Sequence, residues 1–134
     1  MNRTEMREHA FKLIYSLEIQ KTENVQEQID LYFESNNIKG EEAKKYITDA
    51  ILGIEQNKKE IIEDIEKNLK EEWKLSRISK MDLSILKLAI YEIKFSEVPY
   101  KVSINEAVEL AKRYGEDKSK NFVNGILASI VKEM

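Results

Sequence analysis

The chain has 134 residues and a formal net charge of −3, and it contains no cysteine. This length suits one domain with a buried core and is too short for two ordinary domains. The lack of cysteine excludes disulfides and thiolate chemistry, and the slightly acidic balance argues against binding nucleic acid through charge alone. No apolar run reaches the roughly 18 to 20 residues that span a bilayer, and the N-terminus lacks a signal-peptide core. We therefore expect a cytoplasmic protein with no membrane contact.

The first half of the chain has the apolar spacing of amphipathic helices. Met6, Ala10, Leu13 and Leu17 fall on one face of a first helix, with Thr4 as its N-cap. The same period predicts further helices over residues 25–36, 40–54 and 61–69. The outer face of the last of these is densely charged and is typical of a solvated surface.

The most apolar segment of the chain runs from Leu83 to Ile93. It is apolar on nearly all sides, which is typical of a helix at the centre of a fold. A buried strand is the alternative, but the length of the run and its Leu and Ala content favour a helix. Glu92 lies near its end, and a buried carboxylate needs donors, so we expect it to pair with backbone amides or a basic side chain.

The last third of the chain carries turn and capping signals. Pro99 blocks helix continuation, and residues 103–106 (Ser-Ile-Asn-Glu) fit a capping box with Ser103 as the N-cap of a sixth helix. Gly115 suits the left-handed end of that helix. Residues 117–119 then suit the cap of a seventh helix. With no strand pattern in the chain, the sequence predicts an all-α fold of about seven helices.

No residue pattern indicates catalysis. His9 is the only histidine, and without a cysteine or a second histidine it cannot complete a zinc site, so a structural role is favoured. Glu106 is used in the expected cap, and Glu109 on the same helix faces outward. The four glycines are isolated, so no phosphate-binding loop is present. We expect no enzyme activity, no cofactor and no metal. Trp73 is expected to be a core residue at a helix junction, with base stacking as the alternative.

Two groups of residues are candidates for contact with RNA. Arg3 and Arg7 lie one turn apart at the start of the first helix, where free backbone amides also favour phosphate. Lys118 and Lys120 precede the last helix, with aromatic side chains nearby that suit unstacked RNA bases. Solvated surface for the basic residues, and a core position for Phe122, are the alternatives.

Several separated motifs share their order with one known family. The most specific are residues 98–112 (VPYKVSINEAVELAK) and 122–125 (FVNG). The first helix around Arg7 and Tyr15 also matches, as does the stretch from residue 73 to residue 92, whereas residues 21–70 match only loosely. In these motifs the chain resembles the NusB family of bacterial transcription antitermination factors.

The resemblance implies a single domain over residues 1–134 with two packed helical subdomains, at about 1–70 and about 71–134. It also implies binding to the boxA element of nascent ribosomal RNA leaders, together with small-subunit ribosomal protein S-ten (NusE), in a complex with RNA polymerase that resists termination. Neither catalysis nor a cofactor is implied.

The family's RNA contact uses a cluster of N-terminal arginines, of which this chain keeps Arg3 and Arg7. Its partner surface involves the tyrosine of the first helix and the segment at the start of the last helix, where some relatives have an acidic residue in place of Lys118. On this basis we assign Arg3, Arg7, Lys118 and Lys120 to RNA, and Tyr15, Tyr114, Asn121 and Phe122 to the partner.

Two alternatives remain open, and a third is set aside. A helical adaptor that binds only proteins stays open because the arginine cluster is thin. A homodimer also stays open, since some members of the family are dimeric. The helical domain fused to ribosomal RNA methyltransferases is set aside because the chain has no Gly-rich nucleotide-binding segment. If a basic partner supplies phosphate contacts, RNA affinity should rise with the partner, and Arg7→Ala should weaken RNA binding with little loss of stability.

Overall fold

The computed structural model describes residues 1–70 and 73–134 of the chain. This part of the chain forms only helices, with no strand. The helices are α1 (Arg3–Ile19), α2 (Val25–Ser35), α3 (Glu41–Gln56), α4 (Lys58–Lys67), a 3₁₀ turn η1 (Leu75–Arg77), α5 (Lys80–Phe95), α6 (Tyr100–Tyr114) and α7 (Ser119–Glu133). The prediction of an all-α fold with about seven helices is confirmed.

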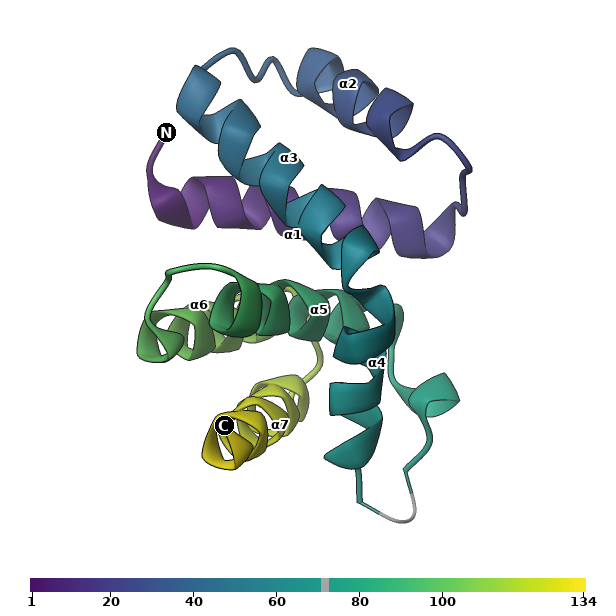
Figure 1. Ribbon diagram of the computed structural model, residues 1–134, viewed down its shortest axis with the longest axis vertical. Helices are drawn as coiled ribbons and strands as arrows, with labels where there is room; N and C mark the ends of the chain where they lie inside the picture. Colours follow the sequence, from purple (N-terminus) through teal and green to yellow (C-terminus); the bar gives the residue numbers. More distant parts are fainter. Residues whose placement is uncertain (71–72) are drawn as a thin grey trace.

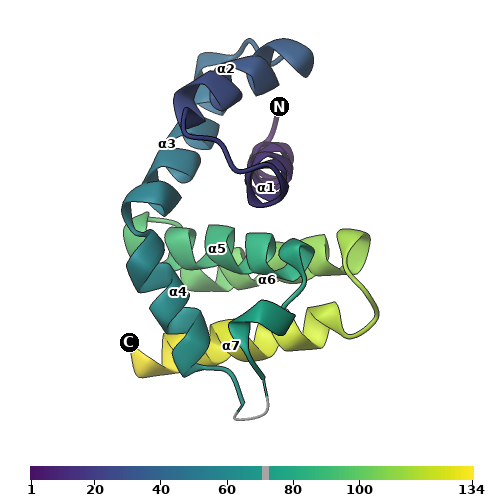
Figure 2. The same ribbon diagram turned by 90° about the vertical axis from the view of Figure 1, so that its right-hand side faces the viewer.

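The helices gather at two ends of an elongated molecule. Helices α1, α2 and α3 lie near the N-terminus, and α5, α6 and α7 lie on the other side of α1 toward the C-terminus (Figures 1 and 2). Helix α4 continues from α3 and packs on α5. The division into subdomains near residue 70 stays a prediction, since α4 extends from the first group of helices into the second.

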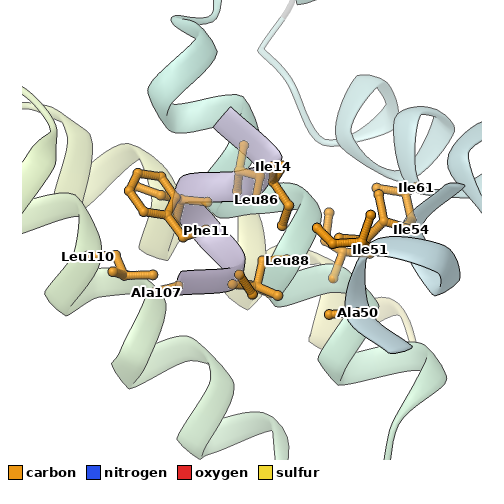
Figure 3. Packing of buried hydrophobic residues seen from close by; sticks show 14 of the residues in the cluster. Phe11, Ile14, Ala50, Ile51, Ile54, Ile61, Leu86, Leu88, Ala107 and Leu110 are labelled. Atoms are coloured by element: carbon orange, nitrogen blue, oxygen red, sulfur yellow. The ribbon is translucent and has the colours of Figure 1, made fainter. Parts of the chain in front are cut away.

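Helix α5 forms the centre of the fold, as its sequence predicts. It contacts α1, α3, α4, α6 and α7, and every residue from Ser84 to Ile90 is buried. Side chains from several of these helices meet in one apolar cluster, among them Phe11 and Ile14 of α1, Ile51 of α3 and Leu86 of α5 (Figure 3). Burial of this cluster is the main favourable term for folding.

The first helix is capped two residues earlier than expected. Asn2, not Thr4, is the N-cap: its side chain accepts from the amide of Glu5, whose carboxylate accepts from the amide of Asn2. This reciprocal capping box satisfies two amides that the helix leaves free. The hydroxyl of Thr4 instead donates to Glu106 at 2.6 Å.

The expected capping box at residues 103–106 is wrong. Helix α6 begins at Tyr100, and Pro99 occupies the N-cap position with φ −58°. The carbonyl of Pro99 accepts from the amides of Val102 and Ser103, so Ser103 already lies inside the helix. Glu106 is then free to face α1, where it accepts from Thr4 and Arg7.

Gly115 ends α6, but not in the left-handed conformation that was expected. Its φ is −91° and its ψ is −174°, an extended conformation open to any residue. The need for glycine is steric: a Cβ atom here would lie 2.5 Å from the hydroxyl oxygen of Ser119 and 2.8 Å from the carbonyl oxygen of Ala111. Gly115 therefore lets the end of α6 approach the start of α7.

The expected cap within residues 117–119 takes another form: Lys118 is the N-cap without a side-chain bond, and Ser119 accepts from the amide of Glu116.

Candidate nucleic-acid and partner interface

Arg7 is buried in the structure, so the expectation of an exposed phosphate-binding side chain is wrong. Only 4% of the residue is exposed, and 1% of Glu92. Its Nε donates to both carboxylate oxygens of Glu92, at 2.9 and 3.0 Å, and its Nη1 donates to Glu106 at 3.1 Å. The physical reason is the burial of Glu92 near the C-terminal end of the central helix α5: a carboxylate in the core needs charged donors, and Arg7 supplies them.

Tyr46 of α3 completes this buried group. Its hydroxyl donates to the second oxygen of Glu92 at 2.9 Å. Glu92 thus accepts from α1 and α3 while lying on α5, which confirms the expectation that it pairs with a basic side chain. We call Arg7, Tyr46, Glu92 and Glu106 the buried polar cluster.

Burial and the neighbouring charges shift the pKa values of Arg7 and Tyr46. Burial alone would lower the pKa of Arg7, but the charge of Glu92, and then Tyr46 and Glu106, raise the pKa above its ordinary value. Burial and then the charge of Glu92 raise the pKa of Tyr46. The guanidinium therefore stays charged and the phenol stays a donor at neutral pH.

Arg3 is the exposed arginine at this end of α1. Its side chain is 57% exposed, and its guanidinium lies 3.8 Å from a carboxylate oxygen of Glu42. The same guanidinium lies 5.2 Å from the centre of the Tyr46 ring, within cation–π range. Of the two arginines assigned to RNA, Arg3 alone is placed to reach a phosphate.

The start of α7 presents a second set of polar side chains. Lys118, Lys120 and Asn121 are exposed, as expected for residues that contact RNA or a partner. Lys120 and Asn121 line a shallow polar depression between α6 and α7, and its remaining lining residues are Asn105, Val108, Glu109, Lys112 and Asn124. Arg3 lines a different depression, formed by α1, α3 and the segment before α6. The residues assigned to RNA therefore fall into two separate groups.

Trp73 is not a core residue. It is 44% exposed, and its ring lies 5.8 Å from the ring of Phe122 in a tilted arrangement. Phe122 itself is partly buried against the core. The two rings form an aromatic pair that is open to solvent on the side of Trp73.

Tyr114 packs with α1. Its hydroxyl donates to Glu8 at 2.8 Å, and its ring lies 5.2 Å from Phe11. Phe11 in turn stacks with Tyr15 at 6.5 Å. The residues assigned to the partner are therefore divided: Tyr15 and Tyr114 are linked through Phe11, whereas Phe122 packs against Trp73.

His9 has the structural role that its sequence context favours. It is partly buried, and its Nδ1 lies 2.8 Å from the hydroxyl of Tyr32. Burial lowers the pKa of His9, with a further contribution from Lys12. Within residues 1–70 and 73–134, no group of potential ligands is arranged to hold a metal ion. No helix in the same residues has both the length and the apolar character to cross a membrane.

Sequence reasoning overlooked the role of Tyr46 and the burial of Arg7. One signal was present: Arg7 precedes Phe11 and Ile14 by four and seven residues, the spacing of the buried face of α1. An arginine on that face and a glutamate on the most apolar helix are the two halves of a buried pair.

The fold and these two groups of exposed side chains define a small all-helical binding protein. The NusB family profile matches residues 4–132. A transcription antitermination protein NusB of Acetivibrio thermocellus is 50% identical over 133 residues, covering 98% of this chain and 90% of the relative. One of Clostridium perfringens is 45% identical over 136 residues, covering 100% and 99%.

Solved structures agree with these relatives. A structure of T. maritima NusB has a TM-score of 0.90 and 36% identity, covering 99% of this chain and 92% of that one. A crystal structure of the antitermination factors NusB and NusE with double-stranded RNA matches with a TM-score of 0.87 and 28% identity, covering 98% and 97%. The chain belongs to the NusB family of transcription antitermination proteins.

Proposed function

We propose that this protein is a cytoplasmic, non-enzymatic antitermination factor. It binds the boxA element of ribosomal RNA leader transcripts together with ribosomal protein S-ten (NusE), and the complex joins RNA polymerase and suppresses termination. The observation that carries the proposal is the full-length match to a NusB chain solved with NusE and RNA.

The charge distribution supports a shared RNA site. The net charge is −3, and the burial of Arg7 leaves Arg3 as the exposed arginine of the N-terminal group. Lys118 and Lys120 add two exposed cations at the start of α7. Three cations give a low affinity for a phosphate backbone, because each neutralised phosphate contributes a limited, salt-dependent amount of binding free energy. A basic partner that adds phosphate contacts raises the affinity of the shared site.

Two separate aromatic groups support the assignment of partner residues. Tyr15 and Tyr114 lie partly exposed beside the buried ring of Phe11, and Phe122 lies partly exposed beside the open ring of Trp73. Aromatic side chains bury large areas at low entropic cost and are enriched at protein interfaces. We assign Tyr15, Tyr114, Asn121 and Phe122 to the partner, and Arg3, Lys118 and Lys120 to RNA.

A helical adaptor that binds only proteins is the second candidate. The pairing of Arg3 with Glu42 favours it, since that carboxylate competes with phosphate for the exposed arginine of the N-terminal group. Native mass spectrometry of the protein with ribosomal protein S-ten and a boxA RNA separates the two functions. A ternary complex that is lost with a scrambled RNA supports the antitermination factor. A binary protein complex that never takes up RNA supports the adaptor.

The same spectra report the oligomeric state of the 15.7 kDa chain. A homodimer that dissociates when the partner is added would mean that both use one surface. A homodimer that persists in the ternary complex would place the two interfaces on different faces.

A further inference from the structure

We propose that Tyr46 positions Arg3 for RNA, and so links the buried polar cluster to the exposed phosphate-binding side chain. This inference rests on the proposed function, because it assigns a residue to the same RNA site. Tyr46 lies on α3, within residues 21–70, whose motifs resemble the family only loosely.

The first step is the position of the Tyr46 ring. The guanidinium of Arg3 lies 5.2 Å from its centre, and the guanidinium of Arg7 lies 5.9 Å from the same point. The ring of Tyr46 is therefore within cation–π range of both the exposed Arg3 and the buried Arg7. An arginine stacks on an aromatic ring better than a lysine does, because its guanidinium is planar and weakly hydrated.

The second step is what fixes the ring. The Tyr46 hydroxyl donates to Glu92 at 2.9 Å, and Glu92 is itself bound twice by Arg7. Glu92 is 1% exposed, so its position is set by the core. The hydroxyl end of the ring that faces Arg3 is therefore held by the buried carboxylate of Glu92.

The third step is the state of Arg3. A solvent-exposed arginine samples many rotamers, and ordering it on a ligand costs entropy. The Tyr46 ring and the carboxylate of Glu42, at 3.8 Å, already restrict Arg3 in the free protein. With a single exposed arginine in the N-terminal group, this preorganisation carries more weight than it would in a dense basic cluster.

A double-mutant cycle tests the proposal. RNA affinity is measured in the presence of ribosomal protein S-ten for the unmodified protein, Tyr46→Leu, Arg3→Ala and the double variant. Loss of a partly exposed cation–π contact predicts that Tyr46→Leu weakens binding about two- to five-fold when Arg3 is present. In the Arg3→Ala background Tyr46→Leu should have no further effect. An equal loss in both backgrounds would make Tyr46 merely structural and would overturn the proposal.

Tyr46→Phe is the matched control, since it keeps the ring and removes only the hydroxyl. Binding should weaken less than with Tyr46→Leu, because the ring stays beside Arg3 and only its anchor to Glu92 is lost; a loss as large as that of Tyr46→Leu would contradict a role for the ring. The NMR signals of the Arg3 side chain give a measurement that does not depend on the folding of a variant. They should be displaced by the ring current in the free protein and should move again with RNA; undisplaced signals would overturn the proposal.

Different results would reject the proposed function and the role of Tyr46. No RNA binding by the unmodified protein with its partner would reject the proposed function and the RNA role of Tyr46 together. RNA binding with additive effects in the cycle would reject only the role of Tyr46.

Discussion

The Nε atom of Arg7 lies 2.9 Å from one carboxylate oxygen of Glu92 and 3.0 Å from the other, and both residues are almost fully buried. The two residues are 85 positions apart in the chain, so this contact joins α1 to the central helix. Removal of one partner would leave the other charged in the core, and such a change costs far more than the net value of the intact pair.

Arg7→Ala should therefore lower the free energy of unfolding by about 3–5 kcal/mol. Urea denaturation followed by circular dichroism measures the change. Arg3→Ala is the control, since a substitution at an exposed position usually changes stability by less than about 0.5 kcal/mol. Similar midpoints for the two variants would contradict the structural role of Arg7.

A large loss of stability in Arg7→Ala would reverse the expectation from the sequence, which was a small loss. Two arginines one turn apart at a helix start satisfy the local pattern of a phosphate site whether or not one of them points inward. The decisive information is non-local, because Glu92 on α5 creates the demand for a buried cation. The wrong prediction of Ser103 as an N-cap has the same cause. The local pattern fits a capping box, but Glu106 instead accepts hydrogen bonds from Thr4 and Arg7 of α1.

Features that depend on hydropathy alone were predicted correctly. The apolar run of α5 defines the central helix because a helix that is apolar on nearly all sides must be buried on most of them. The boundaries of α3 near Gly40 and of α2 near Asn36 also follow from local signals. The exposure of Trp73 could not be predicted, since it depends on the position of Phe122 in a helix far along the chain.

Gly115→Ala should destabilise the protein. A Cβ atom would lie 2.8 Å from the carbonyl oxygen of Ala111, a backbone atom that cannot rotate away. Overpacking of this kind costs about 1–3 kcal/mol, and thermal unfolding should show a lower midpoint.

Gly125→Ala is the matched control for this substitution. Apart from its chain neighbours and the backbone of α7 itself, no atom lies within 4 Å of a Cβ atom there, and the position is inside α7. Alanine should raise stability by about 0.5–1 kcal/mol, because glycine is a poor helix former. If both variants lost stability equally, the close approach at Gly115 would not be the cause of its effect.

Lys118→Ala and Lys120→Ala test the cations at the start of α7. If each side chain neutralises one phosphate of single-stranded RNA, each substitution should reduce the slope of log affinity against log salt by about 0.7. Lys59→Ala, at an exposed position on α4, should leave the slope unchanged. An unchanged slope for both α7 variants would remove this segment from the RNA site.

Stability should depend on pH through His9. Burial lowers the pKa of His9 in the folded protein below its unfolded value of 6.5, so the folded state favours the neutral ring. Burial and the charge of Glu8 raise the pKa of Tyr32 to about 12, which keeps its hydroxyl protonated and able to donate to the ring. The stability that His9 contributes is therefore present above pH 6.5 and is lost as the pH falls through the folded pKa.

Unfolding of the unmodified protein and of His9→Gln at pH 7.5 and pH 5.5 isolates this effect. The unmodified protein should lose more stability than His9→Gln between the two values. Other groups, among them Asp82, whose pKa is raised by burial, contribute equally to both proteins and cancel in the comparison. Parallel losses would mean that His9 titrates normally.

The most direct measurement is fluorescence anisotropy of a labelled boxA RNA titrated with this protein, with and without ribosomal protein S-ten, at two salt concentrations. Because Arg3, Lys118 and Lys120 are the cations assigned to RNA, affinity should be weak for the protein alone and should tighten strongly with the partner, in preference to a scrambled RNA. Binding that is equally tight without the partner, or absent in both arms, would contradict a site that the two proteins share.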